Sequence, residues 1–189
     1  ICVIAGIDYS MNSPCICICD ETKPFNLEVC QFHYLTSIKK YEGAFDDRFH
    51  GTLYPTWSSP EYRFHIISEW ARQRLQVENR VDCVYLEGYA YGAKGKVFHI
   101  GENVGVLKHM LWIYSIPYVE VSPTNVKKFA TGKGNADKAA MHEAFYKKTR
   151  INLRKRLTPD KKDVTNPVSD VVDSFYIAEI CWNALKKEN

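Results

Sequence analysis

The sequence predicts an α/β domain built on a five-stranded mixed sheet flanked by helices. Three observations support this class. Short apolar runs at 2–8, 15–19 and 81–87 are of strand length, and longer stretches in the second half show helical periodicity. A length of 189 residues with 46% hydrophobic content is sufficient for one domain with its own core. We therefore expect a single domain over 1–189, with an insertion at 39–60.

The first third reads as a meander whose first three strands are antiparallel. A polar turn separates the run at 2–8 from the run at 15–19, which is apolar on both faces and predicts a central strand. Residues 27–35 alternate between apolar and polar and predict a third strand. Residues 39–60 are rich in Gly, Pro, Tyr and Asp without a period, which indicates an ordered insertion or a mobile loop.

The rest of the chain alternates helices with two further strands. Residues 61–77 carry apolar side chains at helical spacing, among them Phe64, Ile67 and Trp70. Ser122 before Pro123 is a typical helix start. The remaining elements are a strand at 81–87, a Gly/Tyr-rich loop at 88–96, a helix at 97–114, a strand at 118–121, and helices at 123–131, 136–148 and 166–185. Helical spacing also predicts that Trp70, Trp112 and Trp182 lie in the core.

The net charge of +3 hides an uneven distribution. Between positions 122 and 162 the sequence has twelve Lys or Arg residues against three acids, a net charge of +9. The remainder of the chain must then carry −6. Most basic runs are simply solvated surface, but one beside an acidic pocket suits a metal site next to a polyanion such as nucleic acid.

Four acids stand where an α/β fold places its ligands. Asp8 and Glu87 each end an apolar strand, and the C-terminal ends of parallel strands meet at one sheet edge. Asp170 and Asp173 are three residues apart and share a face at the start of the last helix. Acids in a first helical turn often only complement the helix dipole. That helix is otherwise so apolar that it must pack on the sheet, which would carry both acids to the same edge.

Four like charges buried together without a partner would be very costly. Oxygen-only ligands suit Mg²⁺ or Mn²⁺, and a pair of such ions can stabilise both the attacking and the leaving oxygen of phosphodiester hydrolysis. The sequence therefore predicts metal-dependent phosphate chemistry, with two Mg²⁺ ions for which Mn²⁺ would substitute.

Four segments, in order, resemble the RuvC-type Holliday junction resolvases, which are ribonuclease H-like nucleases. Gly6-Ile7-Asp8-Tyr9-Ser10 resembles the first-strand motif and Leu86-Glu87 the second acid. The run from Ser122 to Lys128, followed by the run from Gly132 to Lys138, is similar to the basic segment of the family. Ser169-Asp170-Val171-Val172-Asp173-Ser174 resembles its final acidic helix. The likeness covers nearly the whole chain apart from 39–60.

This resemblance implies a ribonuclease H-like fold and a homodimer that nicks two strands of a four-way DNA junction, leaving 5′-phosphates. It implies that the two metal ions are held by Asp8, Glu87, Asp170 and Asp173, with Lys138 in the catalytic site. The DNA contacts expected from it and from the charge pattern are Lys127, Lys128, Lys133 and Lys138. Tyr89 and Tyr91 follow Glu87 and would either stack on an unpaired base near the crossover or pack on the domain. On patterning alone, we place the dimer contact on the helix at 97–114.

The insertion at 39–60 and the basic stretch at 150–162 depart from the compact bacterial pattern, and a phage or other viral version fits them. No apolar run approaches the roughly 20 residues of a membrane helix, and the N-terminal run lacks a basic leader. Seven cysteines, an odd number, favour reduced thiols. We therefore expect a cytoplasmic protein (in the host if phage-encoded, otherwise nucleoid-associated or organellar) with no membrane and no small-molecule cofactor.

Other functions remain open. A ribonuclease H that cuts RNA in hybrids would share the acidic site, and a junction-binding architectural protein would share the basic segment but not the hydrolysis. Actin-like sugar kinases also begin with a Gly-Ile-Asp strand, but they need a duplicated second lobe that 189 residues cannot provide. The spacing of Cys15, Cys17 and Cys19 along one strand face is too wide for a zinc site and indicates core packing.

Overall fold

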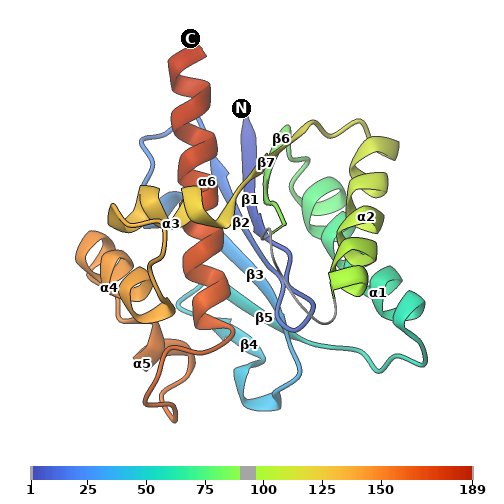
Figure 1. Cartoon of the computed structure of the whole chain (residues 1–189), viewed down its shortest axis with the longest axis horizontal. Coiled ribbons are helices and arrows are strands. Elements are labelled where there is room, and N and C mark those ends of the chain that lie inside the picture. Colours follow the sequence, from blue (N-terminus) through green and yellow to red (C-terminus); the bar gives the residue numbers. More distant parts are fainter. Residues whose placement is uncertain (1, 90–96, 189) are drawn as a thin grey trace.

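The structure is a computed structural model that describes residues 2–89 and 97–188 (Figure 1). One mixed sheet has the order β4-β5-β3-β2-β1-β6-β7. Its strands are β1 (Val3–Asp8), β2 (Cys15–Asp20), β3 (Cys30–Thr36), β4 (Gly43–Phe45), β5 (Phe49–Leu53), β6 (Cys83–Glu87) and β7 (Tyr118–Val121). The α/β class is confirmed, and so is the antiparallel pairing of the first three strands.

The prediction of five strands is wrong, because the insertion adds two. β5 pairs parallel with β3, and β4 pairs antiparallel with β5 at the edge of the sheet. The segment at 39–60 is thus ordered, and it begins with a short 3-10 turn, η2 (Lys39–Tyr41). Its strands are short and only partly buried, so they lack the apolar alternation that identifies a strand in a sequence.

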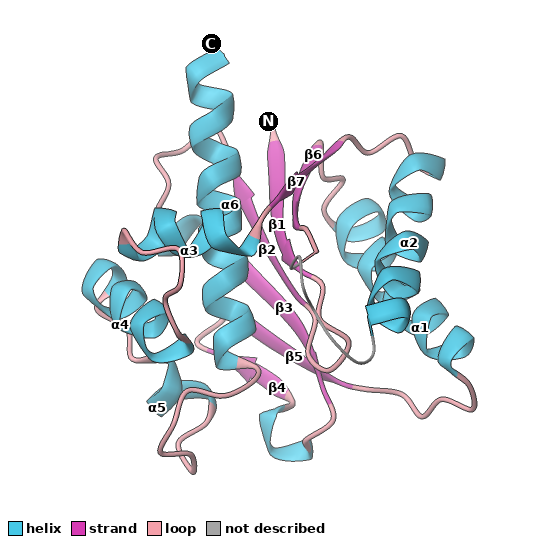
Figure 2. Cartoon of the chain, viewed as in Figure 1, coloured by secondary structure: helices cyan, strands magenta, loops and turns pink. Residues whose placement is uncertain are grey.

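Helices cover both faces of the sheet (Figure 2). One face carries α1 (Pro60–Arg72), its π-helical extension η3 (Gln73–Glu78) and α2 (Val97–Ile113). The other carries α3 (Pro123–Thr131), α4 (Lys138–Thr149), α5 (Leu153–Leu157) and α6 (Val168–Glu188). Strand β1 serves both faces: Ile4 belongs to the core under α6, whereas Ala5 and Ile7 belong to the core under α1 and α2.

The helix boundaries follow local chemistry. The Ser122 side chain accepts a hydrogen bond from the Asn125 amide at 3.2 Å, and Gly132 ends α3 with a φ of 79°. Asp137 caps α4 through the Ala140 amide, so this helix starts at Lys138 rather than 136. The five-residue helix α5 was not predicted, since it is too short to show a period.

Two other expectations need correction. The third strand begins at Cys30, because Asn26 accepts a hydrogen bond from the Glu28 amide at 2.8 Å and winds Leu27–Val29 into a 3-10 turn, η1. Trp70 is buried and Trp182 half-buried, as expected for core residues, but Trp112 is 76% exposed on α2. Helical spacing identified the helix correctly but not which of its faces meets the core.

Within the described ranges, no helix combines the length and apolar character needed to cross a membrane. The three cysteines of β2 are buried with free thiols, in agreement with the core-packing interpretation.

Candidate active site

Four carboxyl groups meet at the C-terminal edge of the central strands. Asp8 is the last residue of β1 and Glu87 the last of β6, and the two strands run parallel with Ile7 opposite Leu86. Asp170 and Asp173 lie in the first turns of α6, which packs across β1. The charges of Glu87, Asp170 and Asp173 all act on Asp8. The predicted convergence of these acids is therefore a feature of the fold.

A glycine in β1 allows α6 to lie this close to the strand. A Cβ atom on Gly6 would stand 2.2 Å from the backbone nitrogen of Ala178 and 2.5 Å from the carbonyl oxygen of Ser174. Both are backbone atoms, so no side-chain rotation could relieve the overlap. Gly6 thus sets the distance between α6 and β1, and with it the distance between Asp8 and the two acids of the helix.

Two serines that the sequence did not single out as site residues hold Asp170 in place. The Ser13 hydroxyl donates to Asp170 Oδ2 at 2.6 Å and the Ser10 hydroxyl to Oδ1 at 3.2 Å. The Ser13 amide in turn donates to Ser10 Oγ at 3.2 Å, which orders the turn between β1 and β2. Ser10 belongs to the first-strand motif, but Ser13 gave no signal, because a serine beside a proline in a polar turn reads only as a turn residue.

Burial and mutual repulsion raise the pKa of every acid in the cluster. The pKa of Asp8 lies well above its ordinary value, chiefly because the group is buried and next because Asp170 is so near. Burial raises the pKa of Glu87 to about 8 and that of Asp173 to about 7, with neighbouring acids adding to both. The pKa of Asp170 is also raised by burial, against the hydrogen bond from Ser13, which lowers it. Near neutral pH the cluster thus holds protons that isolated carboxylic acids would have lost.

Two of the expected DNA-contact lysines border these acids. The charge of Lys127, on α3, lowers the pKa of both Glu87 and Asp173. The charge of Lys138, the first residue of α4, lowers the pKa of Asp170 and Asp173, and its Nζ donates to Asn166 Oδ1 at 3.0 Å. The positive charges of Lys127 and Lys138 therefore stabilise the ionised form of these acids.

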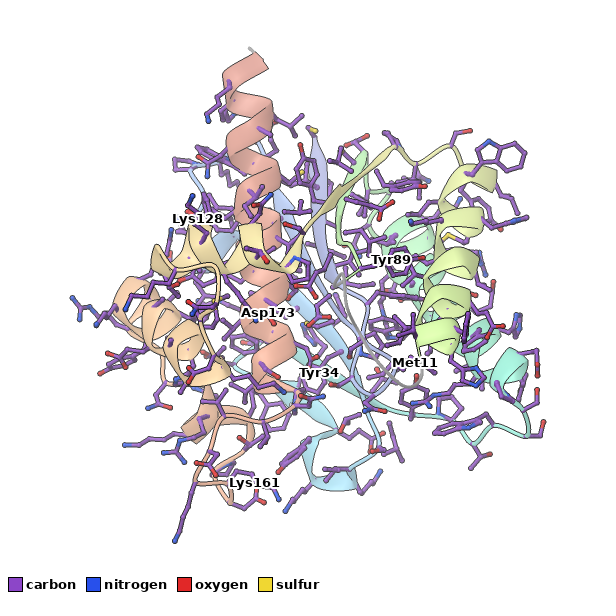
Figure 3. The ribbon with its side chains drawn as sticks, in the orientation of Figure 1. Met11, Tyr34, Tyr89, Lys128, Lys161 and Asp173 are labelled. Carbon is purple, nitrogen blue, oxygen red and sulfur yellow. The ribbon has the colours of Figure 1, made fainter. Side chains whose placement is uncertain are left out.

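The other expected DNA contacts are exposed residues or fall outside the described residues. Lys128 and Lys133 are exposed cations on α3 and the turn after it. Tyr89 is 41% exposed, and its ring lies 4.9 Å from the Lys108 ammonium. Tyr91 lies outside the described residues. In Figure 3, Asp173 lies between Lys128 above and Lys161 below, with Tyr89 on the α2 side.

A cavity of about 730 Å³ opens beside Asp8 and Glu87. Its walls are mainly apolar and come from the turn after β1 and the first half of α2, where Phe98 is 83% exposed. Arg63 of α1 supports the turn by donating to the Met11 carbonyl oxygen at 2.5 Å. A cavity of this size accommodates a group as large as a nucleotide.

The chemistry of the donors fits hard divalent cations: carboxyl oxygens backed by hydroxyl groups, with no sulfur or imidazole among the four predicted ligands. The four carboxyl groups thus lie together at one edge of the sheet, but their oxygens are not arranged around a single ion position. Among residues 2–89 and 97–188, no group of three His, Cys, Asp or Glu side chains already surrounds a position where an ion could sit. Asp8 and Asp170 instead share a hydrogen bond.

The raised pKa values predict how stability depends on pH in the absence of metal. Folded Glu87 and Asp173 keep their protons up to about pH 8 and 7, whereas the unfolded chain loses them near pH 4. The folded state binds more protons, so the free energy of unfolding should fall as the pH rises from about 5 to 8, by up to about 1.4 kcal/mol per pH unit for each such proton. Urea unfolding in EDTA across this range would measure the slope. The Asp173→Asn protein should show a shallower one, and a wild-type stability that rises with pH would contradict the prediction.

No family model matches the sequence. Over 104 residues the chain is 30% identical to the crossover junction endodeoxyribonuclease RuvC of Gloeobacter violaceus, covering 55% of this chain and 54% of that protein. Over 111 residues it is 27% identical to the RuvC of a Synechococcus species, covering 59% of this chain and 63% of that protein. The matched part thus spans between about half and two thirds of these relatives.

The likeness of the fold extends over nearly the whole chain. Thermus thermophilus RuvC superposes with a TM-score of 0.62 at 17% identity, covering 98% of this chain and 96% of that structure. The same protein in complex with a Holliday junction substrate gives a TM-score of 0.63 at 15% identity, covering 99% and 97%. The chain is thus similar to RuvC proteins in fold over nearly its whole length, and in sequence over just over half of it.

Proposed function

We propose that this protein is a metal-dependent endonuclease that cuts branched DNA, with the four-way junction as its principal substrate. One observation carries the proposal: Asp8, Glu87, Asp170 and Asp173 converge from three separate elements beside two lysines. An acidic cluster with raised pKa values is costly to keep unless it binds cations. The names of the relatives, which are RuvC crossover junction endodeoxyribonucleases, favour the same chemistry.

The four acids would hold two Mg²⁺ ions, and Mn²⁺ would substitute. When bound, such ions activate a water molecule as the nucleophile and stabilise the leaving oxygen of a phosphodiester. The residues of the chain would orient the metal ligands and bind the phosphate. Ser10 and Ser13 keep the Asp170 carboxylate oriented, and Gly6 keeps α6 close enough to β1 for the helix acids to act together with Asp8. Lys127 and Lys138 supply positive charge for the phosphate that enters the site.

Junctions are the proposed substrate because Thermus thermophilus RuvC, whose fold matches nearly the full chain, has been solved with a Holliday junction. Two lysines of the basic segment, Lys127 and Lys138, act electrostatically on the acids, which suits a polyanionic substrate. In the ribonuclease H alternative the same centre would cut RNA in hybrids, and in the architectural alternative it would cut nothing.

A panel of labelled substrates separates these functions. The purified protein would be incubated with a four-way junction, a flap, a linear duplex and an RNA–DNA hybrid, each with Mg²⁺, Mn²⁺ or EDTA. We expect paired nicks in the junction with either metal, none in EDTA, and cleavage of the linear duplex slower by at least about tenfold. Preferred cleavage of the hybrid would indicate the ribonuclease H function, and junction binding without cleavage under any metal would indicate the architectural one.

We further propose that the enzyme acts as a homodimer through the outer face of α2, so that two sites nick two strands. This face exposes Phe98 and Trp112, at 83% and 76% of their surfaces, and Phe98 also lines the rim of the cavity beside Asp8. Between them lie Gly101 and Gly105, where an added side chain would meet nothing within 4 Å. Large apolar side chains beside glycines allow a second helix to approach closely, and such exposed apolar faces mark association sites.

The dimer proposal predicts that Trp112→Glu weakens self-association by about 30-fold or more, the effect of losing a buried aromatic anchor. Sedimentation equilibrium would measure it, with Tyr62→Glu on α1 as the matched control, because Tyr62 is a 48% exposed aromatic on a different helix. A wild-type protein that stays monomeric at micromolar concentration would contradict the proposal.

A further inference from the structure

Two segments far apart in the sequence, the insertion at 39–60 and the basic stretch at 150–162, lie against each other. Arg156 of α5 forms an ion pair with Asp46 of the insertion at 2.8 Å. Asp160, just after α5, accepts hydrogen bonds from Lys40 at 2.6 Å and from the Tyr41 hydroxyl at 3.0 Å. The pairs are exposed and each is worth little in stability. Together they join the insertion to the basic segment at two points.

The basic segment is also anchored by buried side chains of α5, which pack in the protein core. Leu153 and Leu157 of α5 are 0% and 1% exposed, packed in the core under α6. Thr158 is fully buried, and its amide donates to the Arg154 carbonyl oxygen at 3.0 Å. Tyr41, whose hydroxyl contacts Asp160, is 1% exposed. The backbone that carries these cations is thus anchored on two sides and is not a free tail.

The anchored segment presents unpaired positive charge. Residues 150–162 contain six Lys or Arg and one acid, Asp160. That acid and Asp46 of the insertion pair with Lys40 and Arg156. Lys155, Lys161 and Lys162 are exposed, and none of them forms an ion pair with a carboxylate of the described ranges. We call these three residues the α5 basic surface.

The α5 basic surface lies on one side of the acidic cluster. The connection that carries Lys161 and Lys162 leads directly into the first turn of α6, where Asp170 lies. In Figure 3, Lys161 is below Asp173 and Lys128 above it. A strand cut at the acids would therefore continue past α3 in one direction and toward α5 in the other.

We propose that the insertion and α5 together form a preorganised site for the phosphate backbone of a duplex arm, outside the cleavage centre. This inference rests on the proposed function for the substrate, but it concerns a separate surface. Lysines bind phosphates as point charges and contribute through counterion release, without reading sequence. The role of the insertion is to brace this surface, so the arm meets charges that are already in place.

The test compares two pairs of lysine substitutions at opposite ends of the molecule. Lys161→Gln/Lys162→Gln removes two charges from the α5 basic surface. Lys23→Gln/Lys187→Gln removes two exposed charges near the C-terminal end of α6, where the Lys23 carbonyl oxygen accepts a hydrogen bond from the Trp182 indole. Affinity for a four-way junction and for a linear duplex would be measured without metal, at several salt concentrations. In the same preparations, the cleavage rate would be measured at saturating junction with Mg²⁺.

We expect the α5 pair to reduce the slope of log affinity against log salt by about 2, since each phosphate contact contributes about 0.9. Its junction affinity should fall about tenfold near 0.1 M salt, while the saturated cleavage rate stays within about twofold, which excludes misfolding. The effect should disappear when the arms are shortened to a few base pairs. An α5 pair that behaves like the control pair would overturn the inference. A wild-type protein without preference for junctions or cleavage of them would refute the proposed function instead, because the salt slope on duplex still reports on the α5 basic surface.

The bracing role has its own test. Tyr41→Phe removes the hydrogen bond to Asp160 without changing any charge. Amide hydrogen exchange of residues 158–163 should become at least severalfold faster, and junction affinity should fall in the same direction as for the α5 pair but less. Unchanged exchange together with unchanged affinity would show that the insertion does not brace the surface.

Discussion

The Asp173→Asn and Asp8→Asn proteins should each lose DNA cleavage by about 10³-fold or more while still binding junctions. Asparagine keeps the shape of the side chain but removes a charge that two divalent cations need, and several kcal/mol of transition-state stabilisation correspond to a rate factor of this size. Binding should survive because Lys127, Lys128 and the α5 basic surface stay in place. Single-turnover cleavage of a labelled junction and a separate binding titration without metal would measure the two effects.

Asp163→Asn is the matched control for these variants. Asp163 is an exposed acid in the connection before α6, so its loss changes the net charge equally without touching the cluster. The control should cleave at the wild-type rate. Unchanged nicking by Asp8→Asn or Asp173→Asn with Mg²⁺ would remove those residues from the metal site.

The second large effect is expected from Gly6→Ala. Its Cβ would overlap the backbone of α6 at Ala178, so the helix must move away from β1. Overpacking of this kind costs typically about 1–3 kcal/mol and occasionally more, and the displacement would separate Asp170 and Asp173 from Asp8. We therefore expect a lower midpoint of urea unfolding together with loss of cleavage, although position 6 itself carries no chemical group.

Gly105→Ala serves as the control for this change. An added Cβ at Gly105 meets nothing within 4 Å of its helix face, so alanine should stabilise α2 by about 0.5–1 kcal/mol. Both variants would be unfolded at a protein concentration low enough to keep the chain monomeric, because an alanine at position 105 would also weaken the proposed dimer. A Gly6→Ala protein that is as stable and as active as wild type would show that α6 does not depend on this close contact.

The central elements could be predicted from sequence because their signals are local. The strand predicted at 118–121 has those bounds in the structure, and the helix predicted at 123–131 starts after Ser122 and ends at Gly132, where a capping hydroxyl and a left-handed glycine mark its ends. The strands of the insertion and the helix α5 escaped prediction, because they are short and depend on pairing with distant segments. Trp112 shows the same limit, since periodicity alone cannot assign the outer face of a helix.

The sequence by itself determined the kind of chemistry: which residues are acids at strand ends, which helix is too apolar to lie in solvent, and where the basic charge concentrates. Only the tertiary structure decided how these parts act together. It placed Ser13 on Asp170, brought Lys127 and Lys138 within electrostatic range of the acids, and set the insertion against α5. The physical reason is that hydrogen bonds and charge interactions act over a few ångströms in space, whereas Ser13 and Asp170 are 157 positions apart in the chain.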